Sequence, residues 1–177
     1  MESIDLVRRN QVDLAVMEER GPEGDVPDEL VFHAWRSYPA YLLIPIGHPL
    51  LRHGVPTFAD LLRGDVVAHF PLVVPEARDA GYQRLDRGLR KLELPFNVAL
   101  EVGTMEAVKR YVSLRLGLGV VVGICLTDDD LTKVAAIEVP SEFGATTTYG
   151  VLLRRDKYQT APLRGLLQLF GVNTASG

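Results

Sequence analysis

The spacing of apolar residues changes in the middle of the chain. Apolar residues first recur every three or four positions, which is the spacing of one helix face. This face consists of Met105, Val108 and Val112, and the polar residues Glu106, Lys109, Arg110 and Ser113 fall elsewhere on the surface of the same helix. A continuous apolar run, Val120 to Val122, then follows and is typical of a buried strand. The pattern predicts a helix over 105–115 followed by a short strand.

The residues on either side of this helix predict how it begins and ends. Gly103 permits a sharp turn, and Thr104 is a good N-cap for a helix that begins at Met105. Gly117 and Gly119 are expected to end the helix, because a left-handed cap is cheapest at glycine. A helix amino end beside a hydroxyl is suited to binding an anion. Most capped helices bind nothing, so the residues alone also permit a plain helix cap.

Similar patterns predict elements along the whole chain. We expect strands at 12–16, 41–46, 97–102 and 147–153, and helices at 77–90, 105–115 and 161–170. Shorter segments include a helix at 2–10, a strand-like run at 30–35 that a turn at 36–39 joins to the next strand, a helix from Thr57 to Leu62, and strands at 66–68 and 133–139. Strands alternate with helices, and this order predicts an α/β fold.

Composition narrows the class of protein. The chain has 177 residues, of which 47% are hydrophobic and 24% charged, and its net charge is -4. This is an ordinary globular composition without a basic surface for nucleic acid. The single cysteine, Cys125, excludes an internal disulfide. The chain opens on acidic and polar residues, and no apolar run approaches the ~20 residues that span a membrane. We therefore expect a cytoplasmic location and no membrane partner.

No set of residues in the sequence favours catalysis or metal binding. The four histidines, His33, His48, His53 and His69, have no ligand spacing with one another or with Cys125. The run Asp128 to Asp130 could chelate a cation, but an exposed charged turn is the commoner form of such a run. The glycines at 117–119 end a helix instead of opening one, so they are not a dinucleotide fingerprint. We expect no enzyme activity, no metal and no cofactor.

An ordered set of motifs resembles the effector-binding domain of LysR-type transcriptional regulators. The matching segments are Val12–Val16 after a helix, Tyr41–Leu50, Thr57–Leu61, Lys109–Gly119, and Thr146–Arg155 before the final helix. The resemblance covers nearly the whole chain. Within the family it is greatest to the branch that includes the regulator of cysteine biosynthesis.

The resemblance implies a fold like that of type II periplasmic binding proteins, with two α/β lobes joined by crossing strands. The regulatory lobe I is expected to hold residues 1–36 and 155–177, lobe II residues 37–146, and the crossover strand residues 147–154. The family's helix-turn-helix domain has no counterpart here, so DNA would be bound only through a domain absent from this chain. The opening strands of lobe I also lack a counterpart. We expect this lobe to be completed by another chain, or to stay incomplete at its amino end, and we predict a homodimer or larger homo-oligomer.

The resemblance also implies a set of effector-binding residues. Thr104 matches a position that contributes to an anion site in the cysteine-biosynthesis branch, and Gly103 and Met105 flank it. Further candidates near the cleft are Ser37, Tyr38, His69 and Thr148. Ser37 and Tyr38 could equally form a turn before Pro39, and Thr146 to Thr148 could be ordinary β-branched packing. Arg115 stands where relatives usually carry glycine, so its charge could face solvent, a dimer partner or the cleft.

These features favour a small-molecule sensing domain of a transcriptional regulator. The expected partner is a small, anionic effector bound in an interlobe cleft, such as a carboxylate or sulfate. One alternative is a solute-binding protein of a transporter, which shares this fold. The other is an enzyme on the same fold, as in some prephenate dehydratases or phosphoribosyltransferases. The absence of an export signal disfavours the first alternative, and the absence of a catalytic set disfavours the second.

Overall fold

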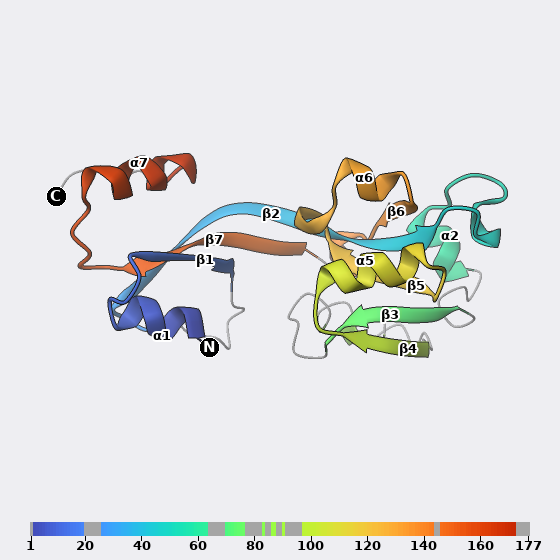
Figure 1. Cartoon of the computed structure of the whole chain (residues 1–177), viewed down its shortest axis with the longest axis horizontal. Coiled ribbons are helices and arrows are strands. Elements are labelled where there is room, and N and C mark those ends of the chain that lie inside the picture. The colour runs from blue at the N-terminus through green and yellow to red at the C-terminus, as the bar shows by residue number, and fades with distance from the viewer. Residues whose placement is uncertain are drawn as a thin grey trace. The chain divides into compact units, whose positions relative to one another are not determined.

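The computed structural model describes residues 2–19, 26–63, 70–76, 83, 86–87, 90, 97–143 and 146–172. Its elements are α1 (Glu2–Arg8), β1 (Leu14–Glu18), β2 (Leu30–Pro45), η1 (Pro49–Leu51), α2 (Phe58–Arg63), β3 (Pro71–Pro75), β4 (Asn97–Val102), α5 (Met105–Ser113), β5 (Leu118–Val122), η2 (Gly123–Cys125), α6 (Asp128–Leu131), β6 (Val134–Glu138), η3 (Ser141–Phe143), β7 (Thr146–Arg154) and α7 (Ala161–Leu169) (Figure 1). The chain forms two compact units. Unit 1 holds Met1–Ser37 and Thr147–Gly177, and unit 2 holds Tyr38–Thr146.

Unit 2 is built on a mixed sheet in the order β4-β3-β5-β2-β6. Strand β3 runs parallel to β4 and β5, whereas β2 is antiparallel to β5 and β6. Successive residues of β2 point to opposite faces, so Leu42 and Ile44 join one core and Leu43 joins the other. Helix α2 covers the first core with Phe58 and Leu61. Helix α5 covers the second, and the predicted apolar helix face is confirmed because Val108 and Val112 are fully buried there.

Unit 1 is built on a smaller sheet in the order β1-β7-β2. Strand β7 pairs antiparallel with β1, from Leu14 opposite Leu153 to Glu18 opposite Tyr149. Helix α7 covers one face of this sheet through Leu163 and Leu167, which pack with Val151 and Leu153 of β7. Helix α1 covers the other face through Val7, which packs with Leu30 and Leu152. Residues 147–154, predicted to form a separate crossover strand, belong to unit 1 because of this pairing and packing.

Strand β2 corrects the predicted pair of strands with a turn at 36–39. The structure has a single strand from Leu30 to Pro45. The residue before a proline favours extended backbone, so Pro39 does not require a turn. Pro39 has no N–H to donate to a neighbouring strand. It lies just before the part of β2 that pairs with β5, which begins at Ala40 opposite Val122. Ser37 and Tyr38 are therefore strand residues.

The end of α5 differs from the predicted glycine stop. The helix ends at Ser113, and Arg115 takes the left-handed backbone conformation, with φ 64°. The Arg115 side chain donates a hydrogen bond of 3.2 Å to the carbonyl of Ile46, within unit 2. The two glycines have a different role, because they allow close packing. A Cβ on Gly117 would lie 2.4 Å from the Pro71 carbonyl oxygen, and one on Gly119 would lie 2.5 Å from a methyl of Val112.

Most other predicted elements are confirmed within a few residues. The predicted strand at 12–16 lies two residues later, as β1, and the predicted helix at 161–170 is α7, with Gly171 left-handed at its end. Strand β3 is missed by the prediction, because its three central apolar residues lie between two prolines. The predicted strand at 66–68 lies outside the described residues. So does most of the helix predicted at 77–90, of which residues 83, 86–87 and 90 are described and helical.

Candidate functional site

The carboxyl ends of three parallel strands of unit 2 meet at one edge of its sheet. Pro75 at the end of β3 is opposite Val102 at the end of β4, and β5 runs in the same direction. The residues that follow these strands are Glu76, Gly103 and Gly123. Ligands of open α/β sheets bind outside the carboxyl ends of their strands. This edge is therefore the candidate site within unit 2.

Thr104 opens α5 at this edge and is the N-cap that the sequence predicts. Its backbone is extended, with φ -145° and ψ 150°, and its hydroxyl oxygen accepts a hydrogen bond of 3.2 Å from the Ala107 amide. The hydroxyl hydrogen can still be donated to a ligand. The first amides of a helix lack carbonyl partners within the helix, and here they belong to Met105 and Glu106. Thr104 is exposed, whereas Met105 is half-buried and packs with the core beneath α5.

Gly103 has a different role from the one predicted. Its φ is not positive, so the turn does not need glycine for its backbone conformation. A Cβ at this position would instead lie 3.3 Å from the Glu76 carboxylate oxygen Oε1. Glu76 thus borders the bend before Thr104 and adds a negative charge to the candidate site. The sequence prediction missed this residue, because β3, which positions it, was itself missed.

Tyr38 lies at the same edge of the unit 2 sheet as Thr104. Because β2 and β5 are antiparallel, with Ala40 opposite Val122, the residues before Ala40 lie beside those that follow β5. A Cβ on Gly123 would be 3.2 Å from the Pro39 carbonyl oxygen, in agreement with this placement. The structure thus brings Tyr38 to the edge at which the predicted residues Gly103, Thr104 and Met105 lie.

The remaining predicted residues belong to unit 1 or lie outside the described residues. Ser37 and Thr148 both belong to unit 1, where their hydroxyl oxygens are 2.9 Å apart and share a hydrogen bond. Of the neighbouring threonines, Thr147 is buried and Thr148 is half-buried. His69 lies outside the described residues. Pro71, two residues after His69, opens β3 opposite Asn97 and so lies at the other edge of the unit 2 sheet.

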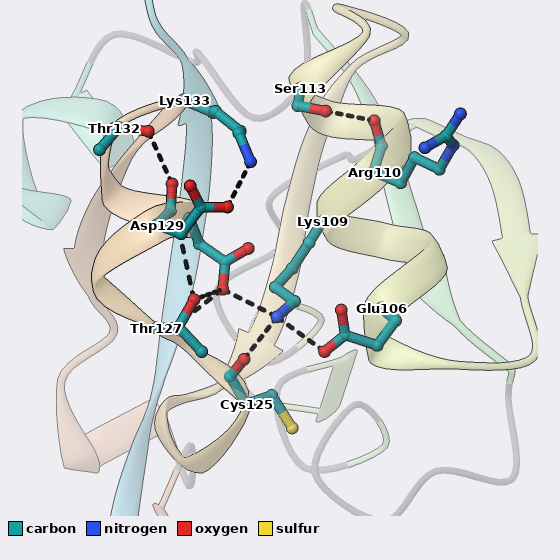
Figure 2. A network of polar contacts seen from close by, with 10 residues as sticks. Glu106, Lys109, Arg110, Ser113, Cys125, Thr127, Asp129, Thr132 and Lys133 are labelled. Atoms are coloured by element: carbon teal, nitrogen blue, oxygen red, sulfur yellow. Dashed lines mark hydrogen bonds and ion pairs between the residues drawn. The ribbon is translucent and has the colours of Figure 1, made fainter.

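Lys109 is buried, although the sequence predicts that it lies on the surface of the helix. Its side chain is only 6% exposed. Its ammonium donates hydrogen bonds of 2.7 Å to the Cys125 carbonyl and 2.8 Å to the Asp130 carboxylate. It also forms an ion pair of 2.7 Å with Glu106, three residues earlier on α5 (Figure 2). The apolar spacing of α5 gives no sign of this cluster, since Lys109 follows Val108 on the polar side of the repeat.

The ion pair keeps both Lys109 and Asp130 charged. Burial disfavours the ammonium, but hydrogen bonds and charges of Asp130 and Glu106 outweigh it and raise the pKa of Lys109. Burial likewise disfavours the Asp130 carboxylate, but hydrogen bonds from Lys109 and Thr127 outweigh it and lower the pKa of Asp130. A charged acceptor and a charged donor form the stronger class of hydrogen bond.

The acidic run Asp128 to Asp130 forms the one-turn helix α6. Thr127 caps this helix: its hydroxyl accepts from the Asp130 amide, and Asp130 accepts from the Thr127 amide in return. This reciprocal arrangement is a capping box. Within the described part of the chain, no group of three His, Cys, Asp or Glu residues could hold a metal ion. The helices of the described residues are also too short or too polar to span a membrane.

Two surface hollows have no predicted site residue in their linings. One, of about 450 Å³ in unit 1, is lined by Asn10, Asp13, Arg154, Asp156, Lys157, Tyr158, Thr160 and Leu163. The other, of about 330 Å³ between α5 and α6, is lined by Glu106, Lys109, Arg110, Ser113, Asp129, Asp130, Lys133 and Val134. In unit 1, Arg154 pairs with Asp156 and Lys157 with Asp13. In unit 2, Lys133 pairs with Asp129. These pairs leave little unbalanced charge for a ligand.

Two α/β units, each a sheet with helices on both faces, define the fold of type II periplasmic-binding-like domains. Residues 1–172 match the family described as the LysR substrate binding domain. The chain therefore belongs to this family, as its resemblance predicts.

Curated relatives agree with the family assignment. The chain is 26% identical over 165 residues to the HTH-type transcriptional regulator CysB of Burkholderia cenocepacia, covering 93% of this chain and 50% of the relative. It is 25% identical to the regulator SsuR of the same organism, covering 81% of this chain and 44% of the relative. It is 24% identical to the regulator cbl of Escherichia coli, covering 81% of this chain and 43% of the relative. The chain thus spans about half the length of these relatives.

Solved structures show the same fold. The cofactor-binding domain of the Cbl transcriptional regulator superposes with a TM-score of 0.76 at 22% identity, over 97% of this chain and 72% of that one. The effector binding domain of QuiR in complex with shikimate superposes with a TM-score of 0.69 at 11% identity, over 93% of this chain and 73% of that one. The regulatory domain of CcmR from Synechocystis PCC6803, in complex with 2-PG, superposes with a TM-score of 0.69 at 15% identity, over 94% of this chain and 75% of that one.

Proposed function

We propose that this chain is the effector-sensing part of a LysR-type transcriptional regulator. In this proposal it binds a small, anionic metabolite, and DNA is bound by a part of the protein outside this chain. The observation that carries the proposal is the family match over residues 1–172. A regulator of this kind acts in the cytoplasm and needs neither a catalytic group nor a cofactor.

The named relatives support sensing over the two alternatives. CysB, SsuR and cbl are all HTH-type transcriptional regulators. Two similar structures hold small molecules, which are shikimate in QuiR and 2-PG in CcmR. These facts support a small-molecule effector as the partner of this chain.

We propose the amino end of α5 as the place where the effector's anionic group binds, with Gly103, Thr104 and Met105 around it. The exposed Thr104 hydroxyl retains a hydrogen to donate, and the neighbouring amides are oriented by the helix. The positive end of the helix dipole favours an anion at this position. Tyr38 borders the same sheet edge and is proposed to contact the effector as well. Ser37, His69 and Thr148 remain candidates by resemblance.

Replacing Thr104 with valine is expected to weaken anion binding about ten- to a hundredfold. A hydrogen bond from a hydroxyl to a charged acceptor contributes roughly 1.5–3 kcal/mol, which corresponds to this range of affinity. The variant is also expected to lose ~1 kcal/mol of stability, because valine cannot cap the helix. Calorimetric titration of the 177-residue chain with sulfate, beside a thermal melt, measures both effects.

Thr160→Val is the matched control for this experiment. Thr160 caps α7 in unit 1, where its hydroxyl accepts from the Leu163 amide at 3.4 Å. The control is expected to lose similar stability and to keep the parent's affinity. Equal affinity of folded Thr104→Val and the parent would show that Thr104 is only a helix cap, and the anion site would have to be abandoned.

We also propose that the chain assembles as a homodimer or larger homo-oligomer. Among the described residues, β1 pairs with β7 and ends the sheet order of unit 1. Val16 on this edge strand is 50% exposed, and Val12 before it is 37% exposed. An open edge strand with apolar side chains is suited to pairing with another chain.

Sedimentation velocity tests the assembly. At tens of micromolar, an order-of-magnitude level that detects modest interfaces, we expect a species of at least twice the monomer mass. Val16→Lys places a charge on the edge strand and is expected to shift the population toward monomer. A clean monomer for the parent chain at this concentration would contradict the proposal.

A further inference from the structure

Lys109 connects three elements of unit 2 through one buried ammonium. Its partners are Glu106 on α5 itself, the Cys125 carbonyl of η2, and Asp130 on α6 (Figure 2). Among the described residues, Lys109 is the single charged residue in the buried class. Asp130 uses the same oxygen, Oδ2, to accept from the Thr127 amide at 2.9 Å and from the Thr127 hydroxyl at 2.8 Å. The oxygen that receives the ammonium is therefore itself held in place.

The other contacts of α5 with the sheet are mainly aliphatic. Val108 and Val112 pack on the sheet above Gly119, which has no side chain to interlock with them. Hydrophobic burial is non-directional, so these contacts hold the helix on the sheet without strongly fixing its rotation or its position along its axis. Charge-assisted hydrogen bonds are short and directional. The Lys109 cluster therefore supplies the orientation that the valines do not.

The cluster also joins two segments that border the candidate site. Lys109 lies five residues after Thr104, so it belongs to the first turns of the same helix. Cys125 ends η2, which follows β5 directly at the carboxyl edge of the sheet. The bond from the ammonium to the Cys125 carbonyl thus sets the separation between the helix that carries Thr104 and the segment after β5.

We propose that Lys109 is a positioning residue for the effector site. It does not touch the ligand; its three contacts hold the amino end of α5 where the amides and the Thr104 hydroxyl can converge on an anion. This inference rests on the proposed function, because the site that Lys109 positions is the one proposed there.

The test compares two double variants, each of which replaces a lysine and an aspartate that pairs with it by neutral residues. Lys109→Met with Asp130→Asn removes the buried pair without leaving a buried charge, and it also removes the pair with Glu106, whose side chain is 77% exposed to water. Lys133→Met with Asp129→Asn removes the exposed pair on the neighbouring surface, where both side chains are more than half exposed. The two variants have the same change in charge, so a difference between them cannot come from net charge.

The first measurement needs no ligand. Amide hydrogen exchange is followed by NMR on the 177-residue chain at Ala107 and Val108, whose amides donate to the Thr104 hydroxyl and carbonyl at 3.2 Å each. Their exchange is expected to be about tenfold faster in the Lys109 double variant than in the parent. Exchange in β5 and in the Lys133 double variant is expected to match the parent. The second measurement is a sulfate titration, in which the Lys109 double variant should bind about tenfold more weakly and the control should bind as the parent does.

The outcomes separate this inference from the proposed function. Unchanged exchange at Ala107 and Val108 in the Lys109 double variant, or an equal change in the control, would overturn the positioning role. Faster exchange throughout unit 2 would show general destabilisation and would also overturn it. A parent chain that binds no sulfate would count against the anion site, while the exchange measurement still decides whether Lys109 orders the amino end of α5.

Discussion

Gly150→Ala is expected to destabilise the chain by about 3 kcal/mol or more, because there is no space for the added methyl group. A Cβ on Gly150 would lie 2.3 Å from the His33 carbonyl oxygen and 2.5 Å from the ring of Phe32. The carbonyl belongs to the backbone of β2, which pairs with β7 in the sheet of unit 1. Relief of the clash therefore requires the two strands to separate, which weakens their hydrogen bonds. Urea unfolding measures the loss.

Gly165→Ala is the control with the opposite sign. Gly165 lies within α7 in the same unit, and a Cβ there meets nothing within 4 Å. Alanine is favoured over glycine in a helix interior by about 1 kcal/mol, so this variant is expected to be more stable than the parent. Near-parental stability of Gly150→Ala would show that β7 and β2 can separate at little cost, and that their close approach at Gly150 does not hold unit 1 together.

The fold is predictable from the sequence wherever periodicity is strong. Helix α5 is one such element, because Val108 and Val112 mark its buried face and Thr104 its start. Its end is less predictable: the sequence offers Gly117 and Gly119 as stops, but Arg115 takes the left-handed conformation. The two glycines are needed for close packing instead, and this requirement depends on strands that are distant in sequence. Strand β3 is missed for a related reason, because three apolar residues between prolines carry no periodic signal.

The candidate site is predictable only where it depends on local chain geometry. The N-cap role of Thr104 follows from residues next to it and is confirmed. The positions of Glu76 and Tyr38 at the same sheet edge depend on strand order, which a single sequence does not reveal. The burial of Lys109 depends on Asp130, twenty-one residues away, and on the backbone of η2. Such contacts bring polar groups together without a periodic pattern along the chain, so the prediction places Lys109 on the surface.

Asp130→Asn is expected to cost about 2 kcal/mol of stability near neutral pH. The asparagine keeps the shape and can still accept from the Thr127 amide, but it gives the buried ammonium of Lys109 no negative partner on α6. The Asp130 side chain is 17% exposed, so water replaces the lost contact only in part. Urea unfolding at about pH 7 measures the difference from the parent.

The same difference is expected to depend on pH in a defined direction. The hydrogen bonds from Lys109 and Thr127 outweigh burial and hold the pKa of Asp130 below its ordinary value of about 3.9. A depressed carboxyl pKa stabilises the folded state above the unfolded-state pKa, and this stabilisation is lost as the pH falls through the folded-state pKa. The parent should therefore lose its advantage over Asp130→Asn on acidification from about pH 5 toward pH 2.

Asp129→Asn is the control for this effect. Asp129 is next to Asp130 in the sequence, but its side chain is 76% exposed and pairs with Lys133 at the surface. An exposed pair contributes at most about 1 kcal/mol, so this variant should remain close to the parent at every pH. Equal and small effects of the two substitutions would mean that the Lys109–Asp130 pair contributes no more than a surface pair. The contact with Asp130 would then not be what orients α5, and the Lys109 contacts with Glu106 and the Cys125 carbonyl would remain.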